Sequence, residues 1–149
     1  MTDPHAVLNN LVRLETELWN ELDARLRTTH GLPMAMYEPI RLIAGASLVR
    51  VHDIAEGLGL TAGGASKLVD RLVEAGYVER STNPHDRRSS VLEPTDLARE
   101  GLRVARRTVS EALESLVTKP LTSAELETLS LLLDRLRTHL RNTQSLVNR

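Results

Sequence analysis

Apolar residues in the first quarter of the chain recur at every third or fourth position. This spacing places them on one face of an α-helix, so it predicts a long amphipathic helix over about residues 4–28 that Gly31 and Pro33 end. A second helix is expected over about residues 34–46. The positions that define the first apolar face are Val7, Leu11, Leu14, Leu18, Leu22 and Leu26.

The next segment predicts two shorter helices joined by a tight glycine turn. Residues 52–58 form the first, and Gly59 closes it because glycine readily adopts the left-handed conformation at a helix end. Thr61 is a good N-cap for the second helix, which begins at Ala62 and ends at Gly76. Its apolar stripe consists of Ala65, Leu68, Val69, Leu72 and Val73.

A hairpin is expected directly after this helix. Residues 77–80 and 89–92 are predicted to be two strands, and the polar turn between them contains Asn83 and Pro84. The run 48–51 is a candidate one-rung strand. Two consecutive helices followed by a hairpin are the elements of a small winged lobe.

The last third of the chain predicts two more helices. Thr95 caps the first, Lys119 and Pro120 end it, and residues 122–125 have the sequence of a capping box that starts the second. The fold class is therefore mainly α with a small β wing, a winged helix-turn-helix inside a helical frame. The leucine seam of the final helix, typical of helices that pack on other helices, consists of Leu126, Leu129, Leu133, Leu136 and Leu140.

Composition limits the classes of protein to which the chain can belong. With 149 residues, 41% of them hydrophobic, one core is expected, so residues 1–149 are predicted to form a single unit. Absence of cysteine excludes disulfides and thiolate metal sites. No basic leader or apolar membrane-spanning run is found, so a cytoplasmic protein is expected. The net charge of −1 gives no bulk support for nucleic-acid binding, so that hypothesis depends on where the cations lie.

The helix that follows Thr61 has a compact polar front. Two glycines in its first turn cost about 1 kcal/mol each relative to alanine, which is understandable if another surface approaches the backbone closely. An α-helix fits the DNA major groove, and a helix N-terminus favours phosphate. The alternative is that the glycines only fray the helix and that its cations are ordinary solvated charges. The front consists of Gly63, Gly64, Ser66, Lys67, Asp70 and Arg71.

A second group of cations is predicted on the hairpin, formed by Arg80, His85, Arg87 and Arg88. Such a group can reach phosphates or a minor groove. Asp86 is the candidate organiser of this wing, because a carboxylate can hold an arginine through a charge-assisted bond.

The stretch HDIAEGLGLTAGGASKLVDRLVEAGYVERSTNPHDRRSSVLEPT resembles the core of the MarR family. Residues 68–72 match the body of its recognition helix, and residues 86–88 match its D-x-R wing signature. The likeness covers the whole chain in element order but only residues 52–95 in motif detail. Pro94 and Ala98 depart from the family's usual leucine and glycine, which affects the entry to the next helix.

This resemblance implies a homodimer that binds a palindromic operator in double-stranded DNA, as a ligand-responsive repressor. The winged lobe would be residues 34–94, and residues 1–30 and 95–149 would supply the dimerisation helices. Recognition helices would lie in successive major grooves. By position, the base-facing residues would be Ala62, Gly63, Ser66 and Lys67, the phosphate-binding residues Thr61 and Arg71, and the minor-groove residue Arg88.

The resemblance also suggests an effector crevice near the first two helices. Its candidate residues are Trp19, His30, Met34, Tyr37 and Arg41. An apolar lining with a few polar groups suits a small aromatic or phenolic acid. The alternative is that Trp19, Met34 and Tyr37 are simply core residues.

Other chemistries find little support in the sequence. The five histidines are scattered with no metal-ligand spacing, and residues 57–62 match a dinucleotide fingerprint but follow a helix instead of a strand. Neither a metal, a cofactor nor an enzymatic activity is expected. The remaining alternative function is a winged-helix protein-interaction module without specific DNA binding, which the near-neutral charge permits.

Overall fold

The computed structural model describes the backbone of residues 3–147 and the side chains of residues 3–85 and 90–143. The chain divides into two compact units, Met1–Val109 and Ser110–Arg149. The fold is mainly helical with a two-stranded wing, as the sequence predicts. Within the described residues no helix is both long enough and apolar enough to span a membrane.

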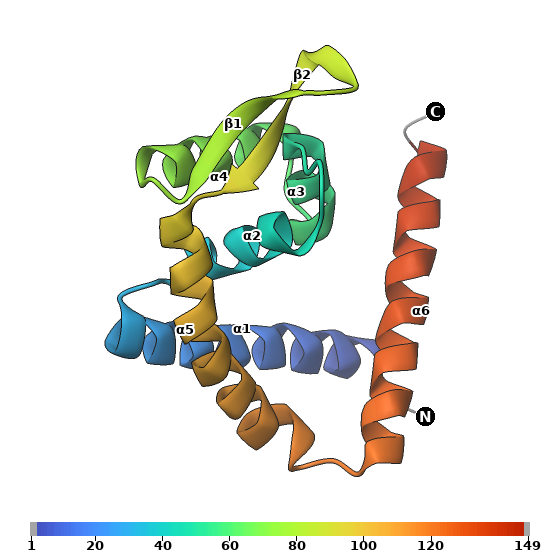
Figure 1. Cartoon of the computed structure of the whole chain (residues 1–149). Helices are drawn as coiled ribbons and strands as arrows, with labels where there is room; N and C mark the ends of the chain where they lie inside the picture. The colour runs from blue at the N-terminus through green and yellow to red at the C-terminus, as the bar shows by residue number, and fades with distance from the viewer. Residues whose placement is uncertain (1–2, 148–149) are drawn as a thin grey trace. The chain divides into compact units, whose positions relative to one another are not determined.

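The first unit contains four helices, the wing and most of a fifth helix. Its elements are α1 (Pro4–His30), α2 (Met34–Gly45), α3 (Val51–Leu58), α4 (Ala62–Glu74), β1 (Val78–Asn83), β2 (Asp86–Pro94) and α5 (Asp96–Leu113), which continues into the second unit. The helices agree with the predicted ones to within about two residues at most ends. In Figure 1 the hairpin runs beside α4, and its turn points away from α2.

The core of this unit is built from aliphatic side chains on every element. Each helix contributes one apolar stripe, as its period of three and four requires. The largest fully buried side chains are Leu26, Pro39, Ile40, Ile43, Ile54, Val69, Leu72, Val78 and Val91. This core fixes α4 and the hairpin against α2 and α3.

The start of α2 is capped by a carboxylate from α1. Pro33 offers no side-chain cap, and the Met34 N–H instead donates to Oδ1 of Asp23 at 2.7 Å. Oδ2 of Asp23 accepts from Nε of Arg27 at 2.5 Å. Partial burial opposes ionisation of this carboxyl, but the bonds from Arg27 and Met34 outweigh it and lower the pKa of Asp23. The carboxylate therefore links the two helices.

The strands of the wing are longer than the sequence predicts. Antiparallel pairing continues through Ser81 with Val91 and Thr82 with Ser90, and a bulge follows Thr82. The sequence places these polar residues in a turn, but a two-stranded ribbon is open to water on much of its surface and tolerates them. The turn is only residues 84–85, where the His85 N–H donates to Oδ1 of Asn83 at 2.9 Å.

The candidate strand over residues 48–51 does not form: residues 48–50 are loop and Val51 begins α3, so only one hydrogen bond links this segment to the wing. The Leu92 N–H donates to the Val49 carbonyl at 2.7 Å, while the sheet itself has only two strands. Leu48 just before it has a φ of 57°, which is uncommon for a leucine.

The second unit comprises the end of α5, a π-helical turn η1 (Glu114–Thr118) and α6 (Ser123–Val147). The predicted capping box is confirmed: the Thr122 N–H donates to Oε2 of Glu125 at 2.8 Å, and the Glu125 N–H donates to Oγ1 of Thr122 at 3.3 Å. The backbone and hydroxyl hydrogen bonds from Thr122 lower the pKa of Glu125. Several leucines of α6 are exposed, namely Leu131, Leu132, Leu133, Leu136 and Leu140.

Candidate nucleic-acid interface

The turn between α3 and α4 is fixed by backbone hydrogen bonds and one threonine. Gly59 is left-handed with φ 65°, and its N–H together with that of Leu60 satisfies carbonyls at the end of α3. Thr61 then accepts the Gly64 N–H at its Oγ1 at 3.1 Å, so it is the N-cap that the sequence predicts. Three residues thus set the angle between the two helices.

The α4 helix has one buried and one exposed side. The buried side is Ala65, Leu68, Val69 and Leu72, as the apolar stripe predicts, although Val73 at its edge is exposed. Among the predicted contact residues, Thr61, Ala62, Gly63, Lys67 and Arg71 are exposed, while Gly64 and Ser66 are half-buried. Among the described side chains neither Lys67 nor Arg71 has an ion-pair partner. The exposed side therefore presents two available cations, Lys67 in the middle of α4 and Arg71 in its last turn.

The two adjacent glycines have different surroundings. A Cβ added to Gly64 would lie 3.2 Å from Oγ1 of Thr61, tighter than an ordinary contact, so the N-cap itself favours glycine there. A Cβ added to Gly63 would meet nothing within 4 Å. The fold therefore supplies no packing reason for glycine at position 63.

The wing brings one of its cations to α4 instead of leaving it free. Nη2 of Arg80 lies 2.6 Å from Oδ1 of Asp70, on the exposed side of α4. The sequence pattern groups Arg80 with the cations aimed at DNA and does not reveal this pair, because the two residues belong to different elements. The side chains of Asp86, Arg87 and Arg88 lie outside the described residues, so their predicted roles stay predictions.

The start of α3 is a feature that the sequence analysis overlooks. The Arg50 N–H donates to Oδ2 of Asp53 at 2.7 Å, which caps the helix and leaves the Arg50 side chain exposed. Exposed Arg50 and His52 add polar groups at the first helix of the pair. The sequence does contain a signal for this cap, because the acidic Asp53 lies three positions after Arg50, as in a capping box. Arg50 is itself a poor N-cap residue, which hides the pattern.

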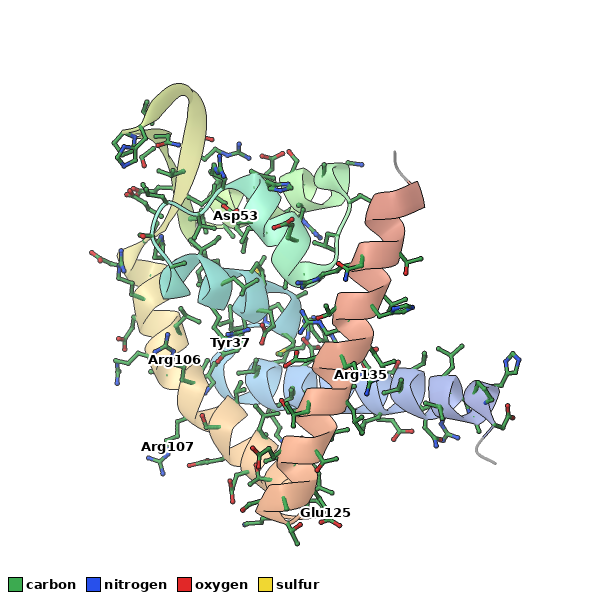
Figure 2. All side chains as sticks on the ribbon, turned by 90° about the vertical axis from the view of Figure 1, so that its right-hand side faces the viewer. Tyr37, Asp53, Arg106, Arg107, Glu125 and Arg135 are labelled. Atoms are coloured by element: carbon green, nitrogen blue, oxygen red, sulfur yellow. The ribbon has the colours of Figure 1, made fainter. Side chains whose placement is uncertain are left out.

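The five residues of the predicted effector crevice fall into three environments. Met34 and Tyr37 are buried in the core, Tyr37 with only 2% of its surface exposed, and Figure 2 shows Tyr37 on the side of α2 toward α1. Burial, followed by the charge of Glu38, raises the pKa of Tyr37. Trp19 on α1 is 37% exposed.

The other two crevice residues have partners within the unit. Nε2 of His30 lies 2.8 Å from Oγ1 of Thr108, which joins α1 to α5. Arg41 pairs with Glu38 at 2.7 Å, and this bond raises the pKa of Arg41. Met34 and Tyr37 are therefore core residues, and a ligand-binding role for the five residues stays a prediction. Among the described residues no group of three or more histidine or acidic side chains is arranged to hold a metal ion.

Two helices joined by a three-residue turn, with an exposed second helix and an adjoining hairpin, define the winged helix-turn-helix class of proteins. Comparison with known proteins narrows the class. The sequence model described as "MarR family" matches residues 39–89, which hold the helix pair and most of the wing.

Two curated proteins are similar to this chain in sequence. The HTH-type transcriptional regulator YfiV of Bacillus subtilis is 32% identical over 103 residues, which span 62% of this chain and 64% of that protein. The multiple antibiotic resistance protein MarR of Escherichia coli is 28% identical over 131 residues, 88% of this chain and 85% of that protein. The chain thus spans slightly less than two thirds of YfiV but most of MarR.

Solved structures share the fold along nearly the whole chain. Sco3205, a MarR family regulator from Streptomyces coelicolor solved in complex with DNA, has a TM-score of 0.83 at 24% identity, covering 94% of this chain and 92% of that one. CouR from Rhodococcus jostii, solved with p-coumaroyl-CoA, has a TM-score of 0.78 at 24% identity, covering 90% and 92%. Residues 39–89 thus match the MarR family, and nearly the whole chain has the fold of solved MarR family regulators.

Proposed function

We propose that this chain binds double-stranded DNA sequence-specifically as a homodimer and acts as a ligand-responsive repressor. The observation that carries the proposal is the exposed side of α4, with Lys67 and Arg71 unpaired within the described residues and Gly63 open to solvent. A helix of this kind, rigidly capped by Thr61, suits insertion into a major groove. Sco3205 was solved on DNA and shares this fold, which supports the same mode here.

The proposal divides the reading of DNA between α4 and the wing. Lys67 lies on the exposed side of α4 and the half-buried Ser66 at the edge of that side, and an ammonium or hydroxyl there can reach base edges. Arg88, organised by Asp86, would read phosphate charge and minor-groove width, with Arg87 beside it. Thr61, Ala62 and Arg71 complete the surface, with Arg71 on a phosphate.

Two substitutions test this division. Lys67→Ala is expected to change the preferred sequence, whereas Arg88→Ala should weaken binding to all duplexes and reduce the salt slope by about 0.9 for each phosphate that is no longer neutralised. Affinities are measured for selected, single-base-altered and random duplexes across a salt series. If both variants keep the wild-type affinity, the DNA-reading face is wrong and the chain is better regarded as a protein-interaction module.

The homodimer is proposed from apolar side chains that each unit leaves exposed. On α1 they are Val7, Leu8, Val12 and Leu14, and on α6 they include Leu133, Leu136 and Leu140. Rows of exposed leucine and valine on long helices are typical of helices that associate. A symmetric dimer presents two copies of α4, which matches a palindromic operator.

The repressor is proposed to respond to a small aromatic or phenolic acid near Trp19, His30, Met34, Tyr37 and Arg41. CouR, with the same fold, was solved with p-coumaroyl-CoA, which carries a phenolic group. Trp19 is the only tryptophan, so its fluorescence reports binding directly. Phenolic acids should quench it and weaken DNA binding together, by about 5- to 150-fold for a typical allosteric coupling. If quenching occurs without any change in DNA affinity, the ligand does not control repression.

A further inference from the structure

Arg80 and Asp70 form an ion pair between the wing and α4 that the proposed function leaves without a role. Nη2 of Arg80 lies 2.6 Å from Oδ1 of Asp70, and the two side chains keep 36% and 65% of their surface exposed. Pairs as exposed as this contribute little to folding stability. Folding stability therefore does not explain this ion pair, and we looked for a role in DNA binding.

Asp70 lies on the same side of α4 as the proposed DNA-contacting residues. It follows Lys67 by three positions and Ser66 by four, the spacing of neighbours on one helix face. An exposed carboxylate there repels the phosphates of an approaching duplex. The whole chain carries 19 basic and 20 acidic residues, so no general positive field offsets this repulsion.

The geometry of the wing directs Arg80 to this carboxylate specifically. Side chains alternate between the two faces of a strand, so Arg80 lies on the face opposite to Ser81. Ser81 bonds to Glu93 through Oγ at 3.2 Å, which places that acidic group on the other face of the hairpin. Among the described side chains Arg80 has Asp70 as its ion-pair partner.

We infer that Arg80 is a positioning residue that neutralises Asp70, so that α4 can approach the phosphate backbone, and that Arg80 does not itself contact DNA. The inference rests on the proposed function, because it assigns Asp70 to the DNA-binding side of α4. It differs from the role expected for a wing arginine, which is to bind phosphate directly.

The test is a double-mutant cycle with Arg80→Ala, Asp70→Asn and the double variant. The DNA is a duplex that the wild-type protein selects from a randomised pool. Arg80→Ala should weaken binding by about tenfold, since it uncovers one carboxylate close to phosphates. The double variant should recover to within about twofold of wild type with the wild-type salt slope, because the repelling charge is gone.

Arg103→Ala is the matched control. Arg103 pairs with Glu100 at the same distance of 2.6 Å, and its removal likewise leaves an exposed carboxylate, but on α5, which belongs to neither the helix pair nor the wing. The affinity of the Arg103→Ala variant for the selected duplex should equal that of the wild-type protein. Thermal unfolding of all variants confirms that each is folded.

Three results would overturn the inference. The first is unchanged binding by Arg80→Ala, and the second is a double variant that binds as weakly as Arg80→Ala. The third is a salt slope of the double variant that falls by about 0.9, as the removal of a direct phosphate-binding cation requires. If the wild-type protein selects no duplex at all, the proposed function fails and this inference with it.

Discussion

At the scale of single residues, a substitution of Gly63 should change folding stability and DNA affinity in opposite directions. A methyl group at this position meets nothing in the protein, so Gly63→Ala should raise the free energy of unfolding by about 1 kcal/mol through helix propensity. The same methyl group stands on the exposed side of α4 and should weaken binding to a selected duplex. Thermal unfolding and DNA titration measure the two effects.

Gly64→Ala serves as the comparison for this prediction. Its new Cβ would crowd Oγ1 of Thr61 at 3.2 Å, so part or all of the propensity gain should be lost through the N-cap. A Gly63→Ala variant that is more stable and binds DNA as well as wild type would contradict close approach at position 63.

Asp23 gives the fold a defined sensitivity to acid. Its pKa is lowered below the ordinary value of 3.8 in the folded protein, so its stabilising contribution is complete above that value. As the pH falls from there through the folded pKa, the carboxylate protonates and this contribution is lost. Asp23→Ala should lower stability by about 1 kcal/mol at pH 7, the usual cost of losing a helix cap. The difference from wild type should shrink toward pH 2 in denaturant titrations, and a constant difference down to that pH would exclude this role.

At the scale of elements, local signals in the sequence determine most of the fold. Each helix cap and the glycine turn involve residues only a few positions apart in the sequence, so local sequence patterns are enough to predict them. These residues are Gly59, Thr61, Thr95 and Thr122. The exposed side of α4 likewise follows from its apolar stripe.

The features that the sequence does not reveal depend on contacts between elements. Asp23 caps α2 from 11 positions before Met34, and Arg80 pairs with Asp70 from 10 positions away. At these separations no periodic pattern in the sequence identifies the partner. The sequence also underestimates the length of the wing strands, because polar residues in an exposed ribbon look like those of a turn. For Met34 and Tyr37 the pattern alone does not distinguish a core position from a crevice lining, because both are apolar surroundings.

Thr95 joins the end of α4 to the start of α5, and its removal tests how much this connection stabilises the fold. Its hydroxyl donates to the Gly76 carbonyl at 2.7 Å and accepts the Ala98 N–H at 3.3 Å, so it ties the end of α4 to the start of α5. Thr95→Ala should cost about 1 kcal/mol of stability, and Thr95→Ser should restore most of it because serine keeps the hydroxyl. Equal stability of the alanine and serine variants in urea titrations would show that these bonds contribute nothing.

At the scale of the whole molecule, the exposed leucines of α6 predict an obligate association. Leu133→Asp combined with Leu136→Asp should give monomers or unfolded chain in sedimentation experiments, because two charges would enter an apolar interface. Thr138→Asp, on the same helix but outside the leucine seam, is the control and should remain dimeric. A wild-type protein that sediments as a folded monomer at micromolar concentration would contradict the dimer.

The central claim is that this chain reads the sequence of double-stranded DNA, and a footprint on the DNA flanking its own gene tests that claim most directly. We predict protection of a palindromic segment, with affinity at least about 10³-fold above that for random duplex at physiological salt. The logarithm of the affinity should fall linearly with the logarithm of the salt concentration. Equal affinity for the flanking and random duplexes, without a protected segment, would contradict sequence-specific binding.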